Sequence, residues 1–105
     1  MSNPTVTVSD NEAEHRFEVH VADELAGFTV FRRRPGVIEF IHTEIEPRFE
    51  GQGLGSQLIR QALETARAEG QAVLPFCPFV NDYIQRHRQY VGLVPEGRRA
   101  EFGLG

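Results

Sequence analysis

The chain has 105 residues, a formal net charge of −4 at pH 7, one cysteine and no tryptophan. This length predicts a single domain over residues 1–105, and the acidic balance argues against nucleic acid and anionic membranes as partners, since both favour basic surfaces. No stretch approaches the roughly 18 apolar residues that a membrane-spanning helix needs. One cysteine permits no internal disulfide and the N-terminus lacks the apolar core of a signal peptide, so we expect a cytoplasmic protein.

The first third of the chain predicts three strands. A short strand is expected at about residues 5–9. Residues 15–21 alternate apolar and polar side chains, as a half-buried strand does, and residues 25–34 return as a third strand. Arg34-Pro35-Gly36 then indicates a tight turn, because Pro followed by Gly suits the central positions of a type II turn.

A fourth strand is expected over residues 37–45. Strict alternation would place Ile38, Phe40, His42 and Glu44 together on one face of this strand. Both faces are largely apolar, so we predict a central strand that is covered on both sides.

From Leu54 the apolar spacing changes to that of a helix. Leu58, Ala62 and Ala66 belong to one apolar stripe, which predicts a helix over residues 55–69 that packs on the sheet. Gly70 stands where a helix commonly ends in a left-handed residue.

The remaining chain predicts a strand at 72–77 and a second helix at 78–87, which opens with a proline that a first helical turn tolerates. The glycine-rich tail at 95–105 is expected to be loosely held. The order is β-β-β-β-α-β-α, and this order predicts an α+β fold with a mixed, mostly antiparallel sheet flanked by helices.

A glycine-rich stretch, Glu50-Gly51-Gln52-Gly53-Leu54-Gly55-Ser56, joins the fourth strand to the first helix. A phosphate-binding P-loop requires a Gly-Lys-Ser/Thr sequence, and no lysine follows these glycines. A dinucleotide fingerprint requires a third glycine where this chain has Ser56. A tight turn without a ligand needs one glycine rather than three, so we expect the N–H groups at this helix start to bind an anion such as a phosphate group.

The loop resembles that of the GNAT-type N-acetyltransferases, which carry Gln/Arg-x-x-Gly-x-Gly/Ala between a central strand and a helix. Here the two glycines of that pattern are Gly53 and Gly55, whereas Glu50 replaces the Gln or Arg. The stretch at about 14–94 resembles the minimal, stand-alone GNAT-like family. Besides the glycine loop, the resemblance depends on His42-Thr43-Glu44, on Cys77-Pro78-Phe79 and on the later Tyr83, His87 and Tyr90.

This resemblance implies a GNAT-like fold that binds acetyl-CoA as co-substrate, needs no metal and transfers acetyl to a primary amine of a small molecule or a protein. The residues expected to hold the coenzyme are Ile45, Gly51, Gln52, Gly53, Leu54, Gly55 and Ser56. Arg32, Arg33 and Arg34 are either ligands of the coenzyme's 3′-phosphate or a solvated charge run at a hairpin tip.

Four residues are candidates for the chemistry. His42 or Glu44 would accept the proton of the amine. Cys77 has three interpretations: an acetyl-carrying thiolate, a group beside the coenzyme's thiol, or a buried small apolar residue. Tyr83 would protonate the departing thiolate, a role that the wider family commonly gives to a tyrosine.

A different class of function is a non-catalytic acyl-CoA-binding or protein-interaction module. The carboxylate of Glu50 favours it, because a negative charge beside a pyrophosphate is repulsive. We expect a monomer or a homodimer in either case, and nothing in the sequence has the spacing of metal ligands.

Overall fold

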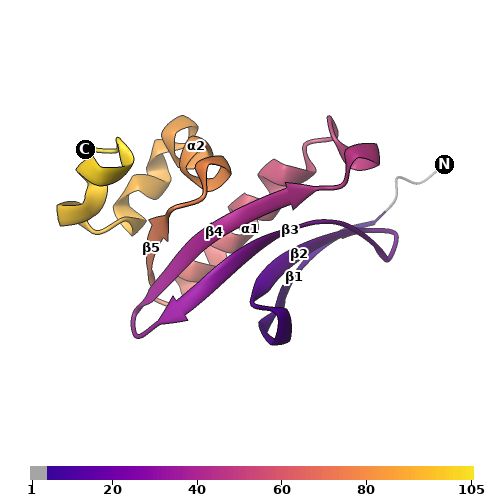
Figure 1. Ribbon diagram of the computed structural model, residues 1–105, viewed down its shortest axis with the longest axis horizontal. Helices are drawn as coiled ribbons and strands as arrows, with labels where there is room; N and C mark the ends of the chain where they lie inside the picture. Colours follow the sequence, from indigo (N-terminus) through magenta and orange to yellow (C-terminus); the bar gives the residue numbers. More distant parts are fainter. Residues whose placement is uncertain (1–4) are drawn as a thin grey trace.

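The computed structural model describes residues 5–105, in which five strands form one sheet in the order β1-β2-β3-β4-β5. The strands are β1 (Val6–Asn11), β2 (Arg16–Val21), β3 (Glu24–Arg34), β4 (Val37–Ile45) and β5 (Ala72–Pro75). Neighbouring strands are antiparallel except β4 and β5, which are parallel because helix α1 (Leu54–Ala68) crosses between them. The predicted α+β fold with a mostly antiparallel sheet is therefore confirmed (Figure 1).

Helix α1 covers one face of the sheet with the apolar stripe that its sequence predicts. Leu58, Ala62 and Leu63 are completely buried, and they join one core with strand residues such as Phe17 and Phe40. The helix ends before Gly70, whose φ of +69° is the left-handed conformation expected there. The inner face of the sheet is thus the face toward α1.

The predicted faces of β4 are wrong in the second half of the strand. Phe31 on β3 pairs with Phe40, but the preceding Val30 pairs with His42, so Ile41 is a bulge with no counterpart on β3. One extra residue reverses the alternation beyond it. Thr43 therefore lies on the inner face of the sheet, as Phe40 does. Its hydroxyl oxygen is 2.9 Å from the hydroxyl oxygen of the buried Thr29 on β3.

The bulge moves the polar side chains of β4 to the outer face, which is the face opposite α1. His42 and Glu44 do not share a face with Ile38 and Phe40 as predicted; their side chains are 59% and 60% exposed. Ile41 is 37% exposed as well, so the second half of β4 is covered on one side only. The position of β4 between β3 and β5 agrees with the predicted central strand.

Strands β4 and β5 separate after four residues. Val37–Phe40 pair with Ala72–Pro75, and the rest of β4 continues alone on that side (Figure 1). Strand β5 is shorter than predicted, because the Phe76 N–H turns back to the Leu74 carbonyl. The Cys77 N–H still reaches the Phe40 carbonyl at 2.9 Å. The unpaired half of β4 consequently has free backbone groups along the edge that faces away from β3.

The C-terminal third packs closely. Helix α2 (Pro78–Arg86) is followed by two 3₁₀ segments at Arg88–Leu93 and Glu96–Phe102. The prediction of a loose tail at 95–105 is wrong, since Phe102 and Leu104 are buried at 8% and 2% exposure. Within residues 5–105, none of the helices combines the length and apolarity that crossing a membrane requires.

Candidate functional site

A cleft of about 620 Å³ lies where β4 leaves β5. Cofactor and small-molecule sites commonly have volumes of roughly 300–1,000 Å³, so this cleft is large enough for such a ligand. It is bordered by the end of β4, the segment that follows it and the first turns of both helices: Thr43, Glu44, Ile45, Pro47, Phe49, Glu50, Gly51, Gly53, Leu54, Gly55, Ser56 and Phe79. Six of the seven residues predicted to bind the coenzyme are among them; Gln52 is exposed and is not.

The glycine loop is held in a backbone conformation that favours glycine. Gly51 and Gly53 have φ values of +79° and +74°, and a Cβ on either would meet nothing within 4 Å. Gly53 is also the residue at which α1 begins. The N–H groups of the first helical turn have no partner inside the helix, and the helix dipole adds partial positive charge there. An end of α1 that favours anions therefore borders the cleft.

Gly55 has a different role from the other two glycines. It lies inside α1 and is buried, and a Cβ there would come within 2.5 Å of the Cζ atom of Phe79. Phe79 belongs to the first turn of α2, and its ring is 41% exposed on the wall of the cleft. Gly55 thus permits the two helix starts to approach, with the Phe79 ring between them.

His42 and Glu44 form a pair on the outer face. The His42 Nε2 and Glu44 Oε1 atoms are 3.7 Å apart, and Glu44 borders the cleft whereas His42 does not. The structure therefore brings these two predicted residues together.

Cys77 lies behind the wall of the cleft. It is 3% exposed, and its Sγ is 3.3 Å from the hydroxyl of Thr43, which does border the cleft. The Thr43 hydroxyl also lies 2.9 Å from that of Thr29, so it contacts two buried side chains, Thr29 and Cys77. Cys77 directly precedes the first residue of α2, as the sequence predicts.

Tyr83 packs among aromatic side chains away from the cleft lining. Its ring stacks on His87 with centroids 4.0 Å apart and lies 5.9 Å from the ring of Tyr90. Burial raises the pKa of the Tyr83 phenol. Tyr90 donates a hydrogen bond of 2.8 Å to Glu64 of α1, so this cluster joins α2 to α1. The structure does not bring Tyr83 together with the other three catalytic candidates.

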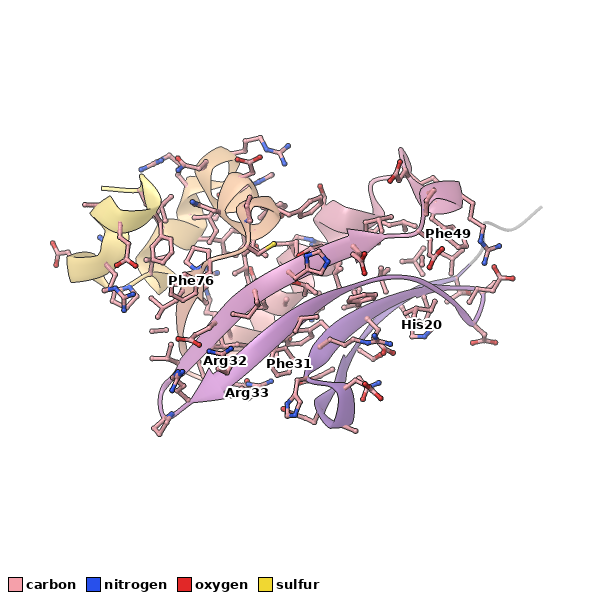
Figure 2. All side chains as sticks on the ribbon, in the orientation of Figure 1. His20, Phe31, Arg32, Arg33, Phe49 and Phe76 are labelled. Carbon is pink, nitrogen blue, oxygen red and sulfur yellow. The ribbon has the colours of Figure 1, made fainter. Side chains whose placement is uncertain are left out.

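The arginine run lies far from the glycine loop. Arg32 and Arg34 pair with Glu39 at 3.6 and 3.3 Å, and Arg33 binds Asp10 at 2.7 Å and Glu69 at 2.9 Å. Figure 2 shows Arg32 and Phe49, a cleft residue, at opposite ends of the long strands. These ion pairs and this position favour the interpretation of the three arginines as a charge run at the hairpin end, with carboxylate partners.

The charges that border the cleft are negative. Among the residues that the structure describes, Glu44 and Glu50 are the charged residues of the lining, and the nearby Arg48 is already paired with Glu24 at 2.9 Å. No three His, Cys, Asp or Glu side chains in residues 5–105 come together so as to hold a metal ion. An anionic ligand here would depend on backbone N–H groups rather than on cationic side chains.

Sequence reasoning did not identify several cleft residues: Thr43, Pro47, Phe49 and Phe79. Thr43 and Phe79 belong to stretches that carried the family resemblance, but a strand threonine and a helix phenylalanine give no local signal of a site. Thr43 faces inward only because of the bulge at Ile41, which alternation along one strand cannot predict.

Comparison with known proteins agrees with this architecture. The family model for GCN5-related N-acetyltransferases matches residues 16–93. A solution NMR structure of a GCN5-like candidate N-acetyltransferase from Staphylococcus aureus is 21% identical, with a TM-score of 0.65 over 90% of this chain and 91% of that one. Among curated proteins, none matches this sequence. Since the family model covers most of the chain, the chain belongs to the GCN5-related N-acetyltransferase family.

Proposed function

We propose that this protein binds acetyl-CoA in the cleft and transfers its acetyl group to a primary amine. The observation that carries the proposal is the cleft itself, which joins the start of α1 to the unpaired edge of β4. The pyrophosphate lies against the N–H groups of residues 53–56, where the helix dipole favours negative charge. The residues proposed to hold the coenzyme are Ile45, Gly51, Gly53, Leu54, Gly55 and Ser56.

The pantetheine arm lies along the free edge of β4. A strand edge offers N–H and C=O groups that an extended chain can pair with, and pantetheine has two amide groups of that kind. Thr43, Glu44 and Ile45 border the cleft on this edge, and β5 has already turned away. This arrangement directs the thioester toward the point at which β4 and β5 separate.

His42 and Glu44 together are the proposed general base, with His42 nearer to the point at which β4 and β5 separate. An amine is protonated near neutral pH and must lose a proton before its nitrogen can attack the thioester carbonyl. The new N–C bond forms as the C–S bond breaks, the thiolate takes up a proton, and one proton in total is released to solvent. Glu44 borders the cleft and His42 lies 3.7 Å from it, so the pair can pass the proton outward. Tyr83 takes no part in this proposed mechanism, because its ring stacks on His87.

A two-step route through Cys77 is a second candidate, favoured by its 3.3 Å contact with Thr43 on the cleft wall. In that route the sulfur attacks the thioester carbonyl, coenzyme A leaves as thiol, and the amine then attacks the acetyl-cysteine. Single-turnover transfer from labelled acetyl-CoA to a panel of primary amines tests both routes. The direct route predicts that acetyl transfer survives Cys77→Ala and that mass spectrometry finds no acetyl adduct on the wild-type chain. The two-step route predicts that Cys77→Ala abolishes transfer and that the wild-type chain carries an acetyl adduct.

The rival function is a non-catalytic acyl-CoA-binding module. Acetyl-CoA binding without transfer to any amine of the panel would support it. The homodimer and monomer expectations are separated by measuring the mass of the protein in solution, with and without acetyl-CoA.

We expect the Glu50 carboxylate to weaken coenzyme binding relative to a neutral side chain at the same position. Glu50 borders the cleft, and its charge repels a pyrophosphate bound at the neighbouring glycines. Glu50→Gln is expected to lower the Kd for acetyl-CoA by roughly threefold, and the gain should shrink in high salt because screening weakens the repulsion. Calorimetry at two salt concentrations checks it.

Glu96→Gln is the matched control, because it makes the same change in net charge on an exposed residue outside the cleft. An equal gain in both variants would show that overall charge, and not the position of Glu50, limits binding.

A further inference from the structure

Two arginines differ from all the others in having no oxygen partner. The chain has 11 arginines and no lysine. Arg60 of α1 and Arg86 of α2 are exposed, and within residues 5–105 neither side chain forms an ion pair or a hydrogen bond. Every other guanidinium lies at ion-pair or hydrogen-bond distance from a carboxylate or carbonyl oxygen. These two positive charges are therefore available to a ligand.

Arg86 lies on the face of α2 that is turned toward α1. Residues three and four positions apart are neighbours on a helix surface, so Phe79, Tyr83 and Arg86 follow one another along one face of α2. The Phe79 ring marks the direction of this face, because a Cβ on Gly55 of α1 would come within 2.5 Å of its Cζ atom. Arg86 is therefore on the side that faces α1.

Arg60 lies on the corresponding face of α1. It comes one helical turn after Ser56 and two turns before Arg67, in one stripe along the helix. Arg67 donates to the Gln89 carbonyl at 3.3 Å and lies over the Tyr90 ring, and both residues belong to the segment that follows α2. This stripe of α1 is therefore turned toward α2, and Arg60 lies between the contacts that the two helices make at either end.

The phenol of Tyr83 lies near both arginines. Burial raises its pKa, and Arg60 and Arg86 act in the opposite direction, as nearby positive charges do. The carboxylates of these helices do not neutralise the pair: Glu64 accepts a tyrosine hydroxyl of the following segment, and Asp82 forms no ion pair within residues 5–105. The groove between α1 and α2 is thus positive, whereas the charges that line the cleft are negative.

The position of this pair suits a phosphate group of a ligand bound in the cleft. Ser56 and Phe79 border the cleft, and the two arginines lie beyond them on the same helices. Arg60 is about 6 Å from Ser56 along the axis of α1, and helical side chains lean toward the N-terminus, so its guanidinium extends back toward the glycine loop. In coenzyme A the pyrophosphate and the 3′-phosphate are attached to the same ribose, so their two sites must lie close together.

We propose that Arg60 and Arg86 bind the 3′-phosphate of the coenzyme while the N–H groups at the start of α1 hold its pyrophosphate. A phosphomonoester carries nearly two negative charges near neutral pH, and a guanidinium can donate two parallel hydrogen bonds to it. The inference rests on the proposed function, because it assigns residues to one end of the same ligand. It makes the protein selective for coenzyme forms that carry the 3′-phosphate.

Calorimetry with acetyl-CoA and with acetyl-dephospho-CoA, which lacks only the 3′-phosphate, tests this selectivity. Because hydrogen bonds between charged groups are strong, wild type is expected to bind acetyl-CoA roughly tenfold more tightly. Arg60→Gln and Arg86→Gln should each lower this ratio to about threefold, and the double variant should bring it within about twofold. Affinity for acetyl-dephospho-CoA should stay within about twofold of wild type in all three variants.

Arg32→Gln is the matched control, since it removes the same charge at the far hairpin end, where Glu39 keeps Arg34 as its partner. It should leave the ratio at the wild-type value; a fall toward onefold would assign the 3′-phosphate to the hairpin arginines and overturn the proposal. Equal affinity of wild type for the two ligands overturns it as well, as does a tenfold preference that persists in the double variant, shown to be folded by thermal unfolding. In both of these results the coenzyme still binds, so the proposed function stands, whereas binding of neither ligand contradicts both.

Discussion

Gly55→Ala is expected to weaken acetyl-CoA binding by roughly tenfold while leaving the protein folded. The new Cβ would lie 2.5 Å from the Phe79 Cζ, so the ring must turn away, and this half-exposed ring has room to do so only by entering the cleft or the solvent. Stability should change little, because alanine gains up to about 1 kcal/mol over glycine within a helix and the displaced ring loses contacts of similar size. Calorimetry with acetyl-CoA checks the loss of affinity, and thermal unfolding checks that the stability is unchanged.

A double-mutant cycle with Phe79→Ala distinguishes two reasons for a glycine at position 55: room for the Phe79 ring, or close approach of the phosphate to the backbone. In the Phe79→Ala background the ring is absent, and Gly55→Ala should then weaken binding by less than about twofold. Gly97→Ala is the control, because a Cβ at Gly97 meets nothing within 4 Å. An undiminished tenfold loss in the Phe79→Ala background would show that Gly55 is required for the approach of the phosphate itself.

Gly27→Val should destabilise the fold by about 3 kcal/mol, which for a domain of this size lowers the Tm by more than about 10 °C. Gly27 of β3 lies opposite Ile45 of β4, and its Cβ would come within 2.5 Å of the Ile45 side chain and 2.6 Å of the Glu44 carbonyl oxygen. The carbonyl belongs to the backbone and cannot turn aside, so the strands must separate. Because Glu44 and Ile45 border the cleft, acetyl-CoA affinity should fall as well.

Gly92→Val provides the comparison for Gly27→Val. It introduces the same side chain at a glycine where a Cβ meets nothing within 4 Å, and it should leave the Tm within about 2 °C of wild type. Equal melting temperatures for the two variants would show that the close approach of β3 and β4 at Gly27 is absent in solution.

Much of the fold could be predicted because local patterns coincide with the final structure. Strand β4 runs from Val37 to Ile45 as predicted, since a run of β-branched and aromatic residues is bounded by a Pro-Gly turn before it and by Glu46-Pro47 after it. The stripe of α1 and the glycine loop at its start are local features of the same kind, and both lie where the sequence predicts them.

The features that could not be predicted depend on segments that are distant in sequence. The bulge at Ile41 is defined by the register of β4 against β3, and no residue type at Ile41 signals it. This one residue decides that Thr43 faces Cys77 and that Glu44 faces outward. In the same way, Phe102 and Leu104 stand in a glycine- and arginine-rich tail, and only the donors on α2 and on Arg88 explain why the tail is packed.

Titration calorimetry of the wild-type protein with acetyl-CoA is the direct test of whether the cleft between β4 and α1 holds the coenzyme. We expect saturable binding of one molecule per chain with a Kd below about 1 mM. Absence of saturable heat at several temperatures, with acetyl-CoA in the millimolar range, would contradict the proposed function.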